Sequence, residues 1–259
     1  MTAPGGWYVY GVVPAEASEE MFEDVAGVAG GQVALIDGGG KLAAIVSEVP
    51  LSEFGEDSIG ENLRDPEWLE GRVRAHEAVL EAALRTAPVV PFRFGTIYRG
   101  EDHVRELLSD EGRRLAAVLE RVRGRLELGV KGFLATPAVE APARDAEEAP
   151  SAGRRYLEEK QRARRLAEEQ AAQKAQWADE SHRRLAAVAE VARANPIPPP
   201  ELSGRDAEMF LNGAYLVPAE REGAFRNVLT ELGDELGPSG VAYELTGPWP
   251  PYNFVGDPQ

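Results

Sequence analysis

The 259-residue sequence contains no cysteine, which excludes disulfides, thiolate metal ligands and cysteine nucleophiles. It contains only three histidines, His76, His103 and His182, and they fall in three separate predicted helices without metal-ligand spacing. There is no Gly-x-Ser-x-Gly elbow, phosphate loop or dinucleotide fingerprint. We therefore expect a protein that is not an enzyme and that binds neither a metal nor a cofactor.

Positive charge is also scarce. Lysine and arginine number 28 against 44 aspartates and glutamates, a formal net charge of -16. This balance argues against non-specific binding to nucleic acid or to anionic membranes. No apolar run approaches the roughly 20 residues that span a bilayer, and the first residues lack the pattern of a signal peptide. We expect a cytoplasmic protein with no membrane insertion.

The first 100 residues alternate strand and helix patterns. Residues 7–13 are aromatic and β-branched and predict a strand, and Ser18 is positioned to cap a short helix that reaches Val25. Two extended runs, 32–36 and 41–49, flank three successive glycines. These glycines favour a hairpin over a phosphate-binding loop, because no Gly-Lys-Ser/Thr follows them.

A second helix in this half begins at Asp65-Pro66-Glu67, which combines a capping side chain with proline at the first helical position. His76 falls on the apolar face of this helix, so we interpret it as a core residue rather than a ligand. A strand over 88–98 then completes a β-α-β-β-α-β order, which predicts a ferredoxin-like domain over residues 1–100.

The rest of the chain repeats this order. Residues 101–124 predict connecting helices with a break at Gly112, and 126–134 predict a strand. Residues 136–152, rich in proline, alanine and acid, are interpreted as a mobile linker, and 153–194 as a long helix with a thin, alanine-rich apolar seam. Further patterns predict a strand over 208–217, a helix over 221–236 and a strand over 241–245.

These patterns predict an α+β fold with two ferredoxin-like α/β sandwich domains. The second domain, residues 125–259, would carry the long, coiled-coil-like helix as an insertion.

The segment Pro88-Val-Val-Pro-Phe-Arg-Phe-Gly-Thr-Ile-Tyr98 concentrates aromatic side chains around one charge. Arg93, between Phe92 and Phe94, has two interpretations. It forms a structural pair at the rim of the core, or it contacts a partner through its planar guanidinium.

The terminal segment Gly247-Pro-Trp-Pro-Pro-Tyr-Asn-Phe254 is the second informative stretch. Its prolines hold the chain extended, so Trp249, Tyr252 and Phe254 would be displayed to a partner at little entropic cost. The alternative is that these aromatic side chains fold back over a sheet and close a core. The sequence leaves both alternatives open.

Five segments, in this order, resemble the gas vesicle protein GvpL/GvpF family over nearly the whole chain. The two specific ones are Pro-Phe-Arg-Phe-Gly-Thr at 91–96 and Gly-Pro-Trp-Pro-Pro-Tyr-Asn-Phe at 247–254. The weaker ones are Trp7-Tyr-Val-Tyr-Gly, His76-Glu77 and Lys131-Gly132. The acidic linker shows no pattern of the family.

The resemblance implies a gas vesicle accessory protein, either a minor structural component or an assembly factor. Such a protein would be located at the vesicle and would bind the hydrophobic shell protein and other accessory gas vesicle proteins. Candidate contact residues are Phe92, Arg93, Phe94, Trp249, Tyr252 and Phe254. Two rivals remain: a small-molecule-binding or enzymatic ferredoxin-like protein, and a coiled-coil scaffold acting through 153–194.

Overall fold

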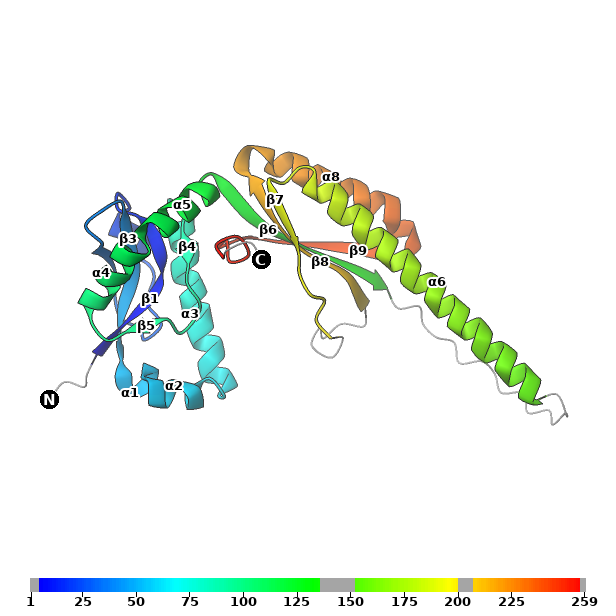
Figure 1. Cartoon of the computed structure of the whole chain (residues 1–259), viewed down its shortest axis with the longest axis horizontal. Helices are drawn as coiled ribbons and strands as arrows, with labels where there is room; N and C mark the ends of the chain where they lie inside the picture. The colour runs from blue at the N-terminus through cyan, green and yellow to red at the C-terminus, as the bar shows by residue number, and fades with distance from the viewer. Residues whose placement is uncertain (1–4, 136–151, 200–206, 257–259) are drawn as a thin grey trace. The chain divides into compact units, whose positions relative to one another are not determined.

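The computed structural model describes residues 5–135, 152–199 and 207–256, with side chains from 156 onward in the second range. Contacts divide the chain into two compact units. Unit 1 comprises Met1–Glu127 with Pro248–Gln259, and unit 2 comprises Leu128–Gly247. Each unit contains one β-sheet with helices packed on it, so the predicted α+β class is confirmed (Figure 1). No helix in the described ranges is both long and apolar enough to cross a membrane.

Unit 1 is built on an antiparallel sheet with the order β2-β3-β1-β4, in which β5 also pairs with β1. Its elements, in chain order, are β1 (Gly5–Pro14), the 3-10 helix η1 (Glu19–Phe22), β2 (Val33–Asp37), β3 (Leu42–Pro50), α1 (Leu51–Phe54), α2 (Glu56–Asn62), α3 (Pro66–Leu84), β4 (Val90–Pro91), β5 (Ile97–Tyr98), α4 (Glu101–Asp110) and α5 (Gly112–Val122).

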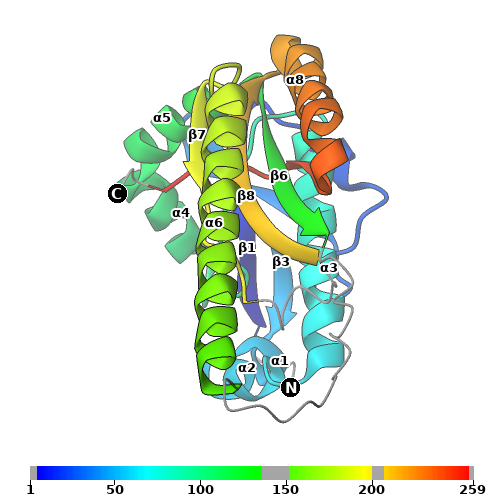
Figure 2. The ribbon, with the colours of Figure 1, turned by 90° about the vertical axis from the view of Figure 1, so that its right-hand side faces the viewer.

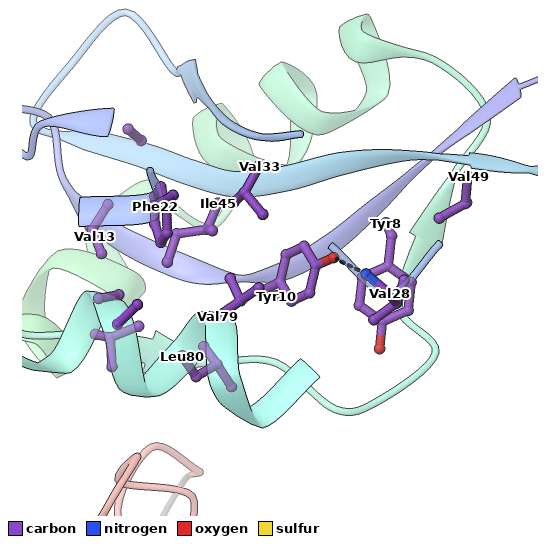
Figure 3. Close-up of a cluster of buried hydrophobic side chains, with 14 of the residues drawn as sticks. Tyr8, Tyr10, Val13, Phe22, Val28, Val33, Ile45, Val49, Val79 and Leu80 are labelled. Carbon is purple, nitrogen blue, oxygen red and sulfur yellow. Dashed lines mark hydrogen bonds between the residues drawn. The ribbon is translucent and has the colours of Figure 1, made fainter. Parts of the chain in front are cut away.

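Helices cover both faces of this sheet. The side chains of α3 pack with Tyr8 and Tyr10 of β1 on one face, and those of α4 and α5 pack with Val9 and Val12 on the other. Side chains of β1 alternate between the two faces, and the register shift between Val9 and Gly11 puts Val12 on the same face as Val9. The Tyr10 hydroxyl accepts a hydrogen bond from the Val28 amide at 2.8 Å (Figure 3). Unit 1 therefore has two buried layers around one central strand.

Three local sequence signals are confirmed. The Asp65 carboxylate accepts from the amides of Glu67 and Trp68 and begins α3. Gly39, with φ of 72°, lies in the hairpin that joins β2 to β3. The helical region after residue 100 is divided at Glu111–Gly112 into α4 and α5.

Unit 2 has the sheet order β7-β8-β6-β9. The C-terminal part of α6 and the helix α8 pack on this sheet, and Figure 2 shows α6 from the side. The elements are β6 (Arg125–Ala135), α6 (Ala152–Ala186), β7 (Val191–Ala194), β8 (Ala207–Pro218), the 3-10 helix η2 (Ala219–Arg221), α8 (Glu222–Leu236), the 3-10 helix η3 (Gly237–Ser239) and β9 (Val241–Trp249).

The long helix differs from its prediction. It ends at Ala186 rather than at residue 194, and Val191–Ala194 pairs with β8 as an edge strand. In chain order α6 lies between β6 and β7, and its description as a coiled-coil-like insertion stays a prediction. Side chains 156–173 are exposed on every side of the helix, a length of about 27 Å. Residues 136–151 of the linker predicted over 136–152 lie outside the described residues, and residue 152 begins α6.

Unit 1 also corrects several predictions. The short helix after β1 is the 3-10 helix η1, with the predicted Ser18 cap in place. The strand expected over 88–98 is two short strands separated by a turn, and α1 and α2 were not predicted. The predicted domain division at residues 100 and 125 stays a prediction; by contacts, residues 101–127 and 248–256 group with unit 1.

Candidate functional site: the Arg93 turn and the C-terminal strap

Residues 92–96, here called the Arg93 turn, form a loop between two strands that pair with the same neighbour, β1. The amide of Phe92 donates to the Tyr10 carbonyl at 2.8 Å, and the amide of Val9 donates to the Thr96 carbonyl at 2.9 Å. Both ends of the turn are thereby attached to β1. Within it, the Arg93 carbonyl accepts from the Thr96 hydroxyl at 2.7 Å and from the Thr96 amide at 3.3 Å.

The two phenylalanines of the turn anchor it to different cores. Phe92 is half-buried and packs against the cluster on the α4/α5 face. Phe94, also half-buried, packs against the α3 face, with ring-centroid distances of 6.0 Å to Tyr8 and 5.8 Å to His76. Each ring buries apolar surface on its own side of the sheet, which fixes the backbone of the residue between them.

Arg93 itself is exposed. Within the described ranges its guanidinium makes no ion pair, hydrogen bond or ring contact. The structural pair considered from the sequence is therefore absent among these residues. The turn therefore presents a guanidinium whose donors have no acceptor among the described residues.

An open hollow of about 530 Å³ adjoins the same turn. Gly95 and Ile97 line it together with apolar side chains of α1 and α2, namely Leu51, Phe54 and Ile59. Gly95 has φ of 82°, and a Cβ there would lie 3.5 Å from Ile59 Cδ1, so a larger residue would project into the hollow. Exposed charges, including Arg99 and Glu56, stand at its rim.

Residues 250–256, here called the C-terminal strap, close on unit 1 through three polar anchors. The amide and the Nδ2 of Asn253 donate to the carboxylate of Glu127, at 3.0 and 2.6 Å. Arg121 donates to the Phe254 carbonyl at 2.5 Å, and the Phe254 ring is 3% exposed. The Tyr252 hydroxyl donates to Glu77 Oε1 at 2.9 Å.

The three terminal aromatic residues, for which the sequence left exposure and core packing open, differ in burial. Phe254 is buried in unit 1, whereas Tyr252 keeps 36% of its surface exposed while its hydroxyl is bonded. Trp249 precedes the strap and is 41% exposed. Of the predicted contact residues, Arg93, Trp249 and Tyr252 present the most accessible surface.

His76 joins the strap to the Arg93 turn by hydrogen bonds. Its Nε2 lies 3.0 Å from the Tyr252 hydroxyl, and its Nδ1 lies 3.0 Å from the Tyr8 hydroxyl. The Gly95 amide donates to the same Tyr8 hydroxyl at 3.0 Å. We call the series Gly95–Tyr8–His76–Tyr252–Glu77 the relay. All of its members belong to unit 1.

Burial determines the protonation states along the relay. Desolvation lowers the pKa of His76 to about 4, although the Phe92 carbonyl acts in the opposite direction. Desolvation also raises the pKa of the Tyr8 and Tyr252 hydroxyls and of the Glu77 carboxyl. At neutral pH His76 is therefore a neutral imidazole and both tyrosines keep their protons.

A second polar cluster supports the same side of unit 1. The Glu53 carboxylate accepts from Trp68 Nε1 at 2.6 Å and from Arg72 at 2.8 Å, and Arg72 also donates to the Val28 carbonyl at 2.7 Å. The guanidinium lies 5.8 Å from the Trp68 ring centroid. The sequence analysis did not identify this cluster, since its members have no motif spacing and are brought together only by the packing of α1 on α3.

The site has exposed groups beside a buried polar series. The described residues contain no group of three or more histidines and carboxylates arranged to hold a metal. The polar atoms of the relay form hydrogen bonds with one another, and its tyrosines remain protonated. The accessible features are the Arg93 cation, the adjoining hollow with its mixed apolar and charged lining, and the exposed aromatic surface near the strap.

The sequence profile of the family described as gas vesicle synthesis protein GvpL/GvpF matches residues 6–256. Gas vesicle protein L from Streptomyces sp. is 36% identical over 221 residues, covering 84% of this chain and 81% of the relative. Gas vesicle protein F2 from Halobacterium salinarum is 28% identical, with coverages of 96% and 91%.

Solved structures share the fold. The crystal structure of GvpF from Anabaena sp. superposes with a TM-score of 0.71 at 19% identity and covers 98% of both chains. GvpF from Microcystis aeruginosa gives a TM-score of 0.64 at 20% identity, over 97% of this chain and 99% of that one. The profile spans both motifs and nearly the whole sequence, and so the chain belongs to the GvpL/GvpF family of gas vesicle synthesis proteins.

Proposed function

We propose that this protein acts in gas vesicle formation as a non-enzymatic accessory protein, either a minor structural component or an assembly factor. It would bind the hydrophobic shell protein and other accessory vesicle proteins, and it would be located at the vesicle and in the cytoplasm. Family membership supports the general role. A shell subunit that polymerises through apolar surface requires a charged partner that delays or directs its association, and a net charge of -16 suits that role.

The observation that carries this proposal is the Arg93 turn. It combines a fixed backbone, an exposed guanidinium with no partner among the described residues, and an open hollow beside it that is lined by both apolar and charged side chains. Arginine flanked by aromatic and apolar surface is typical of residues that dominate protein interfaces. Trp249 and Tyr252 would extend the surface.

We further propose that both units are ferredoxin-like. The sheet orders β2-β3-β1-β4 and β7-β8-β6-β9 correspond strand by strand, and α3 and α8 occupy equivalent connections. In unit 1 the first connecting helix would be reduced to the 3-10 helix η1, and in unit 2 it would be extended into α6. The different lengths of this helix would give the two units different surfaces on one framework.

A pull-down with the shell protein tests the role of the turn. Arg93→Ala should weaken shell-protein binding by about tenfold while leaving the melting temperature unchanged, because the exposed guanidinium makes no hydrogen bond or ion pair with the described residues. Arg113→Ala is the matched control, since Arg113 on α5 is also exposed and has no partner among the described residues. Equal binding by both variants would show that Arg93 is not a contact residue.

Deletion of the gene tests the general role. Absent or deformed vesicles are expected, and normal vesicles in a strain without a paralogue would contradict the proposal. The coiled-coil alternative predicts that α6 alone carries binding, so shortening its exposed turns at 156–173 would abolish it. Under our proposal the shortened protein keeps its binding to the shell protein.

The small-molecule alternative has one observation in its favour, a hollow of about 690 Å³ beside β2. Its ionisable lining is entirely acidic, comprising Glu19, Glu20, Glu23 and Asp24. One of these carboxylates, Glu19, is already used to accept the Leu35 amide on the outer edge of β2, at 2.7 Å. A carboxylate there caps an open strand edge, which protects the sheet from unwanted pairing.

A further inference from the structure

We propose that the C-terminal strap holds the Arg93 turn in position through the relay, with Tyr252 and His76 as positioning residues for partner binding. This inference rests on the proposed function of the turn for its biological meaning, although the coupling itself is a property of unit 1. The Tyr-Asn-Phe part of the terminal motif and the His76-Glu77 pair would thus share one role, which is to hold the Arg93 turn in position.

The donors and acceptors in the relay are determined by its two ends, the Glu77 carboxylate, which can only accept, and the Gly95 amide, which can only donate. The Tyr252 hydroxyl donates to Glu77, so it must accept from His76, which requires the proton on Nε2. Nδ1 is then an acceptor and receives the Tyr8 hydroxyl proton. The oxygen of Tyr8 is left free to accept the Gly95 amide. One tautomer of His76 therefore satisfies every member of the relay.

Loss of the Tyr252 hydroxyl would propagate along this series. The Nε2 proton of His76, a residue that is 1% exposed, would have no acceptor in the strap. A buried donor without a partner is costly, which favours transfer of the proton to Nδ1. The Tyr8 hydroxyl would then have to accept a hydrogen bond from His76 Nδ1, and its own proton would lose its acceptor. His76 and the Gly95 amide would both donate to the same Tyr8 oxygen and so compete for it. The hydrogen bond from the Gly95 amide to Tyr8, which holds the Arg93 turn, is therefore weakened.

The strap itself has enough other anchors to stay in place when this hydroxyl is removed. Asn253 remains bound to Glu127, Arg121 to the Phe254 carbonyl, and the Phe254 ring remains buried. Tyr252→Phe therefore changes the relay with little change in the rest of unit 1.

Hydrogen exchange of the Gly95 amide, followed by NMR on the full chain, measures the coupling directly. Tyr252→Phe should accelerate exchange of this amide by about threefold, because it weakens the Gly95–Tyr8 hydrogen bond without removing the acceptor. Tyr8→Phe removes the acceptor itself and should accelerate exchange by about tenfold, the loss expected for one whole hydrogen bond. Tyr215→Phe is the matched control, because it deletes a tyrosine hydroxyl bonded to a histidine, His182, in unit 2. It should leave Gly95 unchanged.

The imidazole nitrogen shifts of His76 provide a readout that a general loss of stability would not move. The wild-type protein should show the Nε2-protonated tautomer, and Tyr252→Phe should shift the population towards Nδ1. An Nδ1-protonated His76 in the wild type, or an unchanged Gly95 exchange rate in Tyr252→Phe, would overturn the inference. If Gly95 exchange rises while Arg93→Ala still binds the shell protein normally, the coupling stands and the proposed contact role of Arg93 is wrong.

Discussion

The carboxylate of Glu127 is 4% exposed and accepts two hydrogen bonds from Asn253, 126 residues later in the chain. A buried carboxylate requires such partners, because desolvation is costly unless hydrogen bonds compensate it. The pair joins the strand that leaves unit 1 to the segment that returns to it. The terminal motif is therefore part of the stability of unit 1, besides any role at an interface.

We expect Asn253→Ala to lower the free energy of unfolding of unit 1 by about 2 kcal/mol, the contribution of a hydrogen bond to a charged group. Urea unfolding followed with probes in each unit measures this loss. Asn212→Ala is the comparison, because the Asn212 side chain donates to the uncharged carbonyl of Pro196 near the surface. It should cost about 1 kcal/mol or less. Equal losses for the two variants would show that the buried carboxylate does not depend on Asn253.

The burial of neutral His76 predicts that acid destabilises the protein. The pKa of His76 is lowered from 6.5 to about 4, so between these values the unfolded chain binds a proton that the folded chain does not. Stability should fall as the pH drops below 6.5, by about 2 kcal/mol at pH 5. Glu77 acts in the opposite direction, because its raised pKa favours the folded state in acid.

Urea midpoints measured between pH 7 and pH 5 test this dependence. His76→Gln cannot titrate and should show a flatter profile than the wild type. His103→Gln, a substitution at an exposed position on α4, should retain the wild-type slope. Parallel profiles for the wild type and His76→Gln would mean that another group causes the acid sensitivity.

Sequence patterns predicted the features that depend on neighbouring residues. Asp65 and Pro66 begin a helix, the successive glycines make a hairpin and Gly112 divides two helices, because capping and backbone freedom act over a few residues. The apolar spacing also placed His76 in a core. Its partners, Tyr8 and Tyr252, could not be deduced, since hydrogen bonds across 68 and 176 residues depend on the tertiary fold.

The strand β7 shows why the remainder was missed. Val191–Ala194 follows an alanine-rich helix and contains nothing that distinguishes it from another helical turn. It becomes a strand because its backbone pairs with β8. Likewise, the terminal prolines indicated an extended chain but not that its end packs in unit 1. Pairing partners at long sequence separation override weak local preferences.

Salt bridges join helices α6 and α8 of unit 2. Arg184 on α6 donates to Glu235 and Glu231 on α8, at 2.7 and 3.0 Å, with 20% of its side chain exposed. Arg184→Lys loses the forked geometry and should destabilise unit 2 by about 1 kcal/mol, less at high salt. Arg183→Lys disrupts only a pair within α6, with Glu180, and should change stability by a few tenths of a kcal/mol. Thermal melts at low and high salt separate the two cases.

Two glycines of unit 1 should respond to alanine with opposite signs. Gly71 lies in the exposed interior of α3, where an added Cβ meets nothing within 4 Å, so Gly71→Ala should stabilise by about 0.5–1 kcal/mol. At Gly11 a Cβ would lie 2.5 Å from the Val90 carbonyl and 3.2 Å from Pro91 Cα.

Gly11→Ala should therefore push β4 away from β1 and cost about 1–3 kcal/mol. Because β4 leads directly into the Arg93 turn, the same substitution should also weaken shell-protein binding, which Gly71→Ala should leave intact. Urea unfolding and the pull-down, run on both variants, separate the two consequences. A Gly11→Ala protein that is destabilised yet binds normally would show that partner recognition does not need the turn to be fixed to β1.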